Sequence, residues 1–420
     1  MAAGLIPVVI LGSWLVVILW TLLVLALIGL DLRLAGSPRA LEISRTVAHS
    51  VRLTEATTAT LTVRNDGARR AKGLLRDAWQ PSAGPVTNRH AIDIAAGSAA
   101  RINTTLVPTR RGDRLAQHIT VRLFGPLGMA ARQLTLDAPS RLRVLPEFRS
   151  RQHLPSRLAR LRELDGQAAV QLRGAGTEFD SLRPYVEGDD VRSIDWRATA
   201  RAQAVTIRTW RPERDRRVVI VVDTSRTSAP RIGDEPRLDT YIESALLLGA
   251  LASHAGDRVD LIAFDRSVRA TVSDKHGPEL MAAFAQATSG LEPTLVEADF
   301  PAMINAIKKR VSQRALIVLL SNSDLSATDI GLLPVVGALT RDHVVVLGRV
   351  TDPVTAELAK VRNSSVSVYD AAAAEREALD LAAAQEILLR RGVLVTARLP
   401  HQLAPALADT YLGLKAAGKL

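Results

Sequence analysis

Six acidic side chains lie close together between Gly174 and Arg201, the densest acidic cluster of the chain. Convergent carboxylates can hold two metal ions, so a metal-dependent hydrolase is one interpretation. Such sites usually include histidine, and this segment has none. Arginines alternate with the acids, a mixture typical of structural ion pairs and turn caps. The acids are Glu178, Asp180, Glu187, Asp189, Asp190 and Asp195, and the arginines are Arg183, Arg192, Arg197 and Arg201.

Known catalytic motifs are missing from the sequence. It contains no Gly-x-Ser-x-Gly nucleophile turn, no phosphate loop ending in Gly-Lys and no His-Glu-x-x-His, and its eight histidines are scattered. With no cysteine, disulfides, thiolate metal sites and cysteine catalysis are excluded. We therefore expect a noncatalytic protein, and the sequence identifies no small-molecule substrate.

The elements that position these residues must form more than one domain, because 420 residues exceed what one core usually supports. The net charge of +11 suits an anionic membrane surface or reflects an arginine-rich composition. Aromatic residues make up only 4%, and no basic run interleaved with aromatic residues is present to stack bases. We expect no nucleic-acid partner.

The amino-terminal segment, residues 1–32, is predicted to be a transmembrane anchor. Leu5 to Leu30 carries no charged side chain and is long enough to span a bilayer. No Lys or Arg precedes it, which favours an anchor over a cleaved signal peptide. Arg33 and Arg39 follow it, so the positive-inside bias predicts a single-pass protein of the cell membrane with its main domains in the cytoplasm.

Residues 41–146 show short runs of alternating apolar and polar side chains, which predict half-buried strands. Asn65-Asp66-Gly67 and Gly125-Pro126 are hairpin signals between such runs. An antiparallel β-sandwich is the expected fold. The apolar positions are Ala59, Leu61, Val63, Ile119, Val121 and Leu123.

The tripeptide Arg111-Gly112-Asp113 would suit an extracellular adhesion receptor, which is an alternative function. That function requires the opposite membrane topology. An ordinary charged turn between two strands is the interpretation we favour.

Residues 147–216 combine an amphipathic helix with the acidic segment. Leucines recur at helical spacing from Leu154 to Leu164. This helix could lie on anionic lipid or pack its leucines on the neighbouring domain.

From Arg217 to Leu420, strands and helices alternate, which predicts a doubly wound, Rossmann-like α/β domain. Ligand sites in such folds lie at the carboxyl ends of strands, which directs attention to Asp223 after the first strand. Predicted strands cover 218–222, 258–264, 315–320, 344–347 and 393–397. Predicted helices cover 238–254, 279–288, 301–311, 330–340, 371–391 and 402–417.

The motif Asp223, Ser225, Thr227 resembles the Asp-x-Ser-x-Ser loop of von Willebrand factor A-like domains. The resemblance implies a Mg²⁺ site, and hard Mg²⁺ prefers such oxygen ligands. Ala298 and Asn322 depart from the motif, where a hydroxyl and a carboxylate are expected. A turn cap made by Asp223 and Ser225 is the alternative. Compensating oxygens could come from Thr294, Glu297, Asp299, Ser321 or Asp324.

The segment from Gly174 to Arg201 resembles the signature of the "domain of unknown function 58" family. Asp77-Ala78-Trp79 and the carboxyl-terminal sequence add to the resemblance. The resemblance implies a membrane-anchored scaffold or adaptor that works with a MoxR-type AAA ATPase. The signature residues, which we expect to be structural, are Glu178, Arg183, Tyr185, Gly188, Asp189, Asp190, Arg192, Asp195, Trp196 and Arg201.

Overall fold

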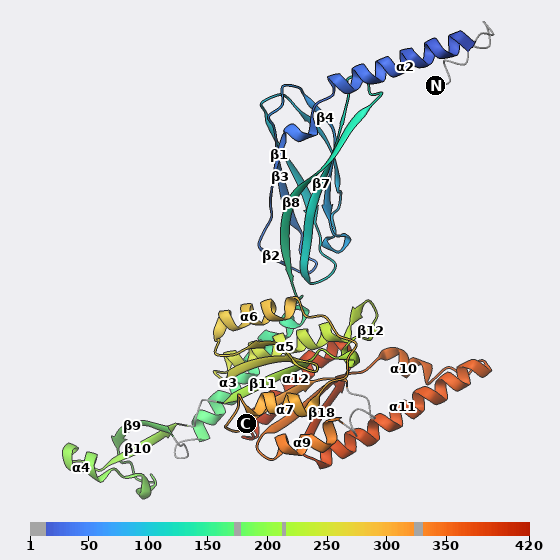
Figure 1. Ribbon diagram of the computed structural model, residues 1–420. Coiled ribbons are helices and arrows are strands. Elements are labelled where there is room, and N and C mark those ends of the chain that lie inside the picture. Colours follow the sequence, from blue (N-terminus) through green and yellow to red (C-terminus); the bar gives the residue numbers. More distant parts are fainter. Residues whose placement is uncertain (1–13, 172–177, 212–215, 323–330) are drawn as a thin grey trace. The chain divides into compact units, whose positions relative to one another are not determined.

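The computed structural model describes residues 14–171, 178–211, 216–322 and 331–420. Contacts between residues divide the chain into two compact units, Met1–Glu147 and Phe148–Leu420. The first unit holds one apolar helix and two sheets, and the second holds a six-stranded sheet with its helices (Figure 1).

Helix α2 (Trp14–Leu34) is apolar along its whole length until Asp31 and Arg33. Its 21 residues measure about 32 Å at 1.5 Å per residue, close to the thickness of a bilayer core. Within the described part of the chain it is the one helix long and apolar enough to cross a membrane.

The strands of the first unit form two sheets. The three-stranded sheet has the order β1-β3-β6, and the five-stranded sheet has the order β2-β8-β7-β4-β5. Their bounds are β1 Leu41–Thr46, β2 Ser50–Arg52, β3 Thr57–Asn65, β4 Ala71–Trp79, β5 Arg89–Ile94, β6 Ala99–Leu106, β7 Gly112–Phe124 and β8 Ala131–Leu145.

The predicted alternation is present in these strands. Leu61 and Val63 of β3 and Ile119 and Val121 of β7 are fully buried and belong to one core shared by the two sheets. One pairing departs from the expected antiparallel arrangement, because β2 runs parallel to β8.

The hairpin predicted at Asn65 is wrong, whereas the one at Gly125 connects the antiparallel strands β7 and β8. Asn65 ends β3, and the next strand, β4, belongs to the other sheet. The Asn65 side chain is buried and donates hydrogen bonds to the carbonyls of Arg69 (2.8 Å) and Ile94 (3.1 Å). The Asn65 amide therefore stabilises the connection between the two sheets. Short-range turn statistics cannot distinguish this role from that of a hairpin residue.

The second unit is built on a sheet of order β15-β14-β11-β16-β17-β18, in which all neighbours are parallel except β15 and β14. Strand β15 is an antiparallel edge that the alternation of elements did not predict. The strands are β11 Arg217–Asp223, β14 Arg258–Phe264, β15 Val268–Val272, β16 Ala315–Leu320, β17 Val344–Val350 and β18 Val393–Arg398, with β12 Arg231–Ile232 and β13 Glu235–Pro236 forming a short separate pair.

Helices cover both faces of this sheet (Figure 1). Alternate residues of β11 point to opposite sides: Ile220 packs in one core with α5 and α12, and Val221 packs in another with α7 and α9. The helices are α3 Leu154–Gln171, α5 Arg237–His254, α6 Gly277–Ser289, α7 Phe300–Lys308, α9 Leu333–Thr340, α10 Pro353–Leu358, α11 Ser365–Arg390 and α12 Pro400–Ala416. Leu161 of α3 is buried in the first of these cores, and Leu154, Leu158 and Leu164 pack against it.

The acidic segment has a regular structure that the sequence did not predict. Strand β9 (Glu178–Pro184) pairs antiparallel with β10 (Thr206–Arg211), and helix α4 (Trp196–Ala202) lies in the connection between them. Its apolar residues are too few and too irregularly spaced to show a period, because the pairing is local and most of the surface is exposed.

Candidate functional site

The carboxyl ends of three parallel strands meet at one edge of the six-stranded sheet. Asp223 ends β11 and pairs in register with Phe264 of β14, and Val222 pairs with Leu320 of β16. Because the strands are parallel and in register, the residues that follow each strand gather at this edge.

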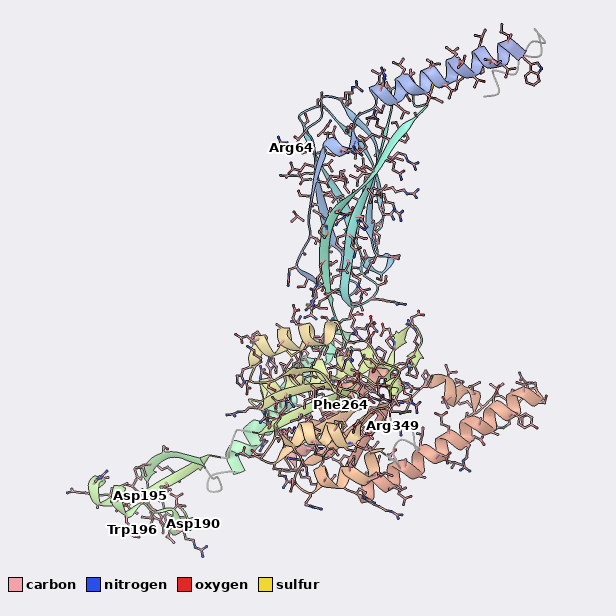
Figure 2. The ribbon with its side chains drawn as sticks, viewed as in Figure 1. Arg64, Asp190, Asp195, Trp196, Phe264 and Arg349 are labelled. Carbon is pink, nitrogen blue, oxygen red and sulfur yellow. The ribbon has the colours of Figure 1, made fainter. Side chains whose placement is uncertain are left out.

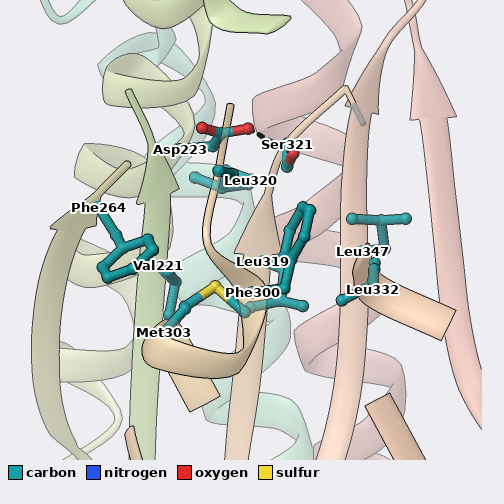
Figure 3. Close-up of a pocket in the computed structure, with 11 residues that line it drawn as sticks. Val221, Asp223, Phe264, Phe300, Met303, Leu319, Leu320, Ser321, Leu332 and Leu347 are labelled. Carbon is teal, nitrogen blue, oxygen red and sulfur yellow. Dashed lines mark hydrogen bonds between the residues drawn. The ribbon is translucent and has the colours of Figure 1, made fainter. Parts of the chain in front are cut away.

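The carboxylate of Asp223 is the centre of a group of hydroxyls. Its Oδ1 accepts a hydrogen bond from the backbone N–H of Ser225 at 2.7 Å. Its Oδ2 accepts from Thr227 Oγ1 at 2.9 Å and from Ser321 Oγ at 2.6 Å. The hydroxyls of Ser225 and Thr227 lie 3.2 Å apart. Figure 3 shows Asp223 and Ser321 joined at the strand ends.

The loop that carries these groups is held by its own backbone. Ser228 Oγ donates to the carbonyl of Asp223 at 2.7 Å, and Thr224 N donates to the carbonyl of Phe264 at 2.8 Å. The loop from Asp223 to Ser228 is buried apart from Arg226, which is half-buried. The donor set of one carboxylate and three hydroxyls is hard and suits Mg²⁺, although the same bonds would also serve a turn cap.

Ala298 and Asn322, the two residues that differ from the metal motif, lie in different environments. Ala298 lines a small apolar pocket below the strand ends. Asn322 is buried, and its Oδ1 accepts from Tyr241 Oη and from the backbone N–H of Val350, both at 3.0 Å. Burial, followed by the nearby charge of Asp223, raises the pKa of Tyr241. Tyr241 therefore stays protonated and acts as a donor to Asn322.

Among the neighbours considered as compensating ligands, Ser321 is the one bonded to Asp223. Thr294 lies one step away, because its backbone N–H donates to the carbonyl of Thr224 at 2.7 Å. Glu297 forms an ion pair with Arg226.

Asp299 caps helix α7 through the N–H of Ala302, at 2.9 Å. Asp324 lies outside the described residues. Of the described oxygens that sequence reasoning could not choose between, the hydroxyl of Ser321 is therefore the one nearest to Asp223 by hydrogen bonding.

A second carboxylate, that of Asp265, was missed by sequence reasoning. It follows β14 at the same edge and accepts hydrogen bonds from Thr294 Oγ1 at 2.9 Å and from the backbone N–H of Ser267 at 3.1 Å. Burial acts to raise the pKa of Asp265, but these hydrogen bonds and one from Arg266 N outweigh it and lower that pKa. The strand-end rule that selected Asp223 applies equally to this residue.

An apolar pocket lies directly below the edge (Figure 3). Asp223 and Ser321 form its polar end, and the rest is formed by side chains from β11, β14, β16, β17 and α7 together with Ala298 and Leu332. The apolar lining residues include Val221, Phe264, Phe300, Met303, Leu319, Leu332 and Leu347. This lining shields the Asp223 carboxylate from water on one side, which strengthens its interactions with cations and donors.

In the acidic segment, three carboxylates, those of Asp189, Asp190 and Asp195, serve the local structure. Arg183 makes two hydrogen bonds to Asp189, at 2.8 and 2.6 Å, and these raise the pKa of the Arg183 guanidinium. Asp189 also accepts from the N–H of Val186 at 2.9 Å. The turn between them contains Gly188 with φ of 103°, a conformation that favours glycine.

Asp190 and Asp195 are caps. Asp190 accepts from the N–H of Arg192 at 2.9 Å. Asp195 begins helix α4, accepts from the N–H groups of Arg197 and Ala198 at 3.0 Å, and pairs with Arg208 at 2.8 Å. The bond from Ala198 N and then that from Arg208 lower the pKa of Asp195.

The remaining signature residues are dispersed. Tyr185 joins β9 to the other side of the segment through its backbone N–H, which donates to the carbonyl of Val205 at 2.8 Å. Glu178 lies at the start of β9, whereas Arg192, Trp196 and Arg201 are exposed (Figure 2 labels Trp196). Over the ranges that the structure describes, no three His, Asp or Glu side chains are grouped so as to hold a metal ion.

Comparison with known proteins finds relatives of unknown function. Uncharacterized proteins of Mycobacterium bovis and Mycobacterium tuberculosis are 26% identical over 200 residues, which cover 47% of this chain. The match spans 62% of the length of these curated relatives.

Two solved structures each resemble about a quarter of the chain. The CARDB domain of a Pyrococcus furiosus protein is 10% identical, with a TM-score of 0.19, over 25% of this chain and 94% of that domain. The PapD-like domain of human CEP192 is 15% identical, with a TM-score of 0.19, over 25% of this chain and 85% of that domain. These scores are too low to establish a common fold.

The family match covers most of the acidic segment and most of the six-stranded sheet with its helices. The model of the family described as "Protein of unknown function DUF58" matches residues 181–391, just over half of the chain. The chain therefore belongs to the DUF58 family.

Proposed function

We propose that this chain is a noncatalytic, membrane-anchored scaffold that binds a protein partner at the edge of the sheet around Asp223. The observation that carries the proposal is the group of oxygens from Asp223, Ser225, Thr227 and Ser321, supplied by the ends of two neighbouring parallel strands. Open α/β sheets place their ligand sites at this edge.

A magnesium ion is part of the proposal. The hydroxyls of Ser225, Thr227 and Ser321 would bind the ion, and the Asp223 carboxylate would balance its charge directly or through water. A partner carboxylate would complete the coordination, as the resemblance to von Willebrand factor A-like domains implies. The loop is already ordered by hydrogen bonds to Phe264 and Thr294, so little conformational entropy would be lost on binding.

The proposed anchor is helix α2, with the two sheets of the first unit and the whole second unit in the cytoplasm. Its length and apolar composition support a membrane span. The family resemblance favours a MoxR-type AAA ATPase, or the client of one, as the partner. The ATPase would supply the energy, and this chain would supply the attachment to the membrane.

The hydrolase alternative has no specific support. Asp189, Asp190 and Asp195 are each used in an ion pair or a cap of the acidic segment. The adhesion alternative is weakened in the same way, because Asp113 is paired with Arg141 (2.7 Å) and Arg143 (2.9 Å).

Affinity capture of the full chain from detergent-solubilised membranes tests the proposal. We expect a AAA ATPase or its client to be recovered with Mg²⁺ present and to be lost with EDTA or in Asp223→Ala. Asp342→Ala is the matched control, because Asp342 is an exposed carboxylate at the amino end of β17. Equal recovery by the wild type and Asp223→Ala, with and without Mg²⁺, would contradict a metal-dependent contact.

A measurement of the melting temperature of the purified protein tests for Mg²⁺ binding in the absence of a partner. Mg²⁺ that binds only the folded state raises the melting temperature of the second unit. We expect this rise in the wild type and in Asp342→Ala but not in Asp223→Ala. A rise that survives in Asp223→Ala would place the ion elsewhere.

A further inference from the structure

The exposed part of the acidic segment has a composition that its internal contacts leave unexplained. We refer to residues 181–208 as the hairpin module; they comprise residues 181–184 of β9, helix α4 and residues 206–208 of β10. Large apolar side chains are unusually exposed there: Trp196 at 71%, Val191 at 63% and Val186 at 61%, with Leu182 and Val205 also exposed. Clustered exposed apolar groups mark interaction surfaces.

Only some of the charged side chains of the hairpin module form ion pairs within it. Two of its arginines, Arg183 and Arg208, are paired with Asp189 and Asp195. Three others, Arg192, Arg197 and Arg201, are exposed. No ion pair is formed by these three with any residue that the structure describes. The exposed acids that remain are Glu187 and Asp190, and Asp190 is used to cap the turn at Arg192.

Helix α4 carries Trp196 and two of the three exposed arginines. Arg197 and Arg201 are four residues apart and so share one face of the helix, next to the row formed by Trp196 and Ala200. Two like charges at this spacing repel each other unless an external anion neutralises them. The Asp195 cap fixes the start of the helix and therefore the direction of Trp196 and Arg197. Figure 2 labels Asp195 and Trp196.

We propose that the hairpin module binds the anionic surface of a phospholipid bilayer through Trp196 and the arginines Arg192, Arg197 and Arg201. Arginines attract anionic headgroups, and tryptophan with aliphatic side chains prefers the boundary between headgroups and acyl chains. The same chain carries an apolar helix of membrane-spanning length, which would hold the module near a bilayer at high effective concentration. The net charge of +11 acts in the same direction.

A lipid surface fits these residues better than the other anionic partners. Nucleic acid would be recognised through a row of stacking aromatic rings, whereas Trp196 is the one exposed aromatic ring among residues 181–208. A folded acidic protein would need complementary pockets for the aliphatic groups, whereas a bilayer accepts them at any spacing. The proposal is independent of the Asp223 site.

The absence of cysteine allows a direct test in the full-length protein. Ala200→Cys places a single thiol on the exposed face of α4, where an environment-sensitive nitrobenzoxadiazole label can be attached. The labelled protein is reconstituted into vesicles of phosphatidylcholine alone or mixed with phosphatidylglycerol. We expect a brighter, blue-shifted label, shielded from aqueous iodide, in the anionic vesicles only. High salt should reverse the effect.

Charge-removing variants identify the groups responsible. The triple variant Arg192→Gln, Arg197→Gln, Arg201→Gln should lower the attachment equilibrium constant on the order of 100-fold, since each arginine near an anionic surface contributes about fivefold. Trp196→Ala should lower it as well. The matched control removes the same charge from exposed positions elsewhere, as Arg110→Gln, Arg266→Gln, Arg341→Gln, and should keep the signal. Thermal unfolding of each variant checks that the fold is intact.

Three outcomes would overturn the proposal. The label is as exposed in anionic vesicles as in neutral ones; the control triple variant loses as much signal as the arginine variant; or shielding requires the addition of membrane proteins. The last result would assign the surface to an acidic protein instead. A label on Ala373→Cys, an exposed position of α11, reports any general effect of the vesicles.

Discussion

Asp31 and Gly125 lie so close together that a side chain at position 125 would overlap the carboxylate. A Cβ at Gly125 would lie 2.2 Å from Cγ of Asp31. The turn after Gly125 surrounds that carboxylate, which accepts hydrogen bonds from the N–H groups of Leu127 (2.7 Å), Met129 (2.8 Å) and Ala130 (2.8 Å). An acid in the last turn of an apolar helix is unfavourable by itself, and these three donors compensate for it.

Asp31→Asn should therefore destabilise the first unit by about 2 kcal/mol, because an amide offers one acceptor oxygen and leaves at least one N–H of the turn without its partner. Chemical denaturation in detergent, followed through the buried Trp79, measures the loss. Hydrogen exchange should accelerate at Leu127, Met129 and Ala130. Asp66→Asn, a change at an exposed acid of the same unit, is the control and should cost under about 0.5 kcal/mol.

Gly125→Ala tests the same contact from the other side. It should loosen the turn and speed exchange of the same amides while leaving the carboxylate intact. Protection of those amides in Gly125→Ala equal to that in the wild type would show that the turn does not depend on the close approach.

The sequence predicts an apolar helix and a turn, but it does not show that an acid of the helix accepts hydrogen bonds from the turn. Asp31 is 94 residues from Gly125, and nothing local to either marks the pairing. The alternation of strands and helices after Arg217, by contrast, is a local pattern, and it predicted the parallel strands and the edge that carries Asp223. Ser321 and Asp265 follow strands at that edge too, but their hydrogen bonds depend on strand order and register.

Arg45 and Asp77 form a buried ion pair in the first unit. Their side chains are 1% and 0% exposed and 2.6 Å apart. Trp79 Nε1 donates to the same carboxylate at 2.9 Å, and the guanidinium lies 5.4 Å from the Trp79 ring centroid. Asp77→Ala should cost about 3 to 5 kcal/mol, because it leaves the Arg45 charge buried and unpaired.

The double variant Arg45→Met, Asp77→Leu should cost less than Asp77→Ala, since it removes both charges and refills the volume. Denaturation of the two variants in detergent measures the difference. If the double variant is the less stable one, the ion pair itself stabilises the unit beyond what apolar packing can replace.

Asp265 should make stability depend on pH. Although burial opposes its ionisation, hydrogen bonds from Ser267 N, Thr294 Oγ1 and Arg266 N lower the pKa of Asp265 in the folded state. Its contribution is therefore present above the unfolded pKa of about 3.9 and is lost as the pH falls through the lower, folded pKa. The free energies of unfolding of the wild type and Asp265→Asn should differ at neutral pH and converge in acid.

Asp299→Asn is the control for this comparison, because Asp299 caps the exposed start of α7 at the same side of the sheet. It should change stability by about 1 kcal/mol or less. A gap between wild type and Asp265→Asn that stays constant from neutral pH to strong acid would show that the carboxylate charge is not what stabilises the loop.

Ser321 is the hydroxyl best placed to distinguish a metal site from a turn cap. Ser321→Ala removes its 2.6 Å hydrogen bond to Asp223 and should cost about 1 kcal/mol in either case. Ser244→Ala is a matched control, because Ser244 is equally buried and donates to the carbonyl of Thr240 at 2.8 Å within α5. If the oxygens around Asp223 hold Mg²⁺, the ion should raise the melting temperature of Ser244→Ala as it does that of the wild type, and should raise that of Ser321→Ala distinctly less. If Mg²⁺ raises the melting temperatures of the two serine variants equally, Ser321 is part of a turn cap and not of a metal site, because a turn cap does not depend on an ion.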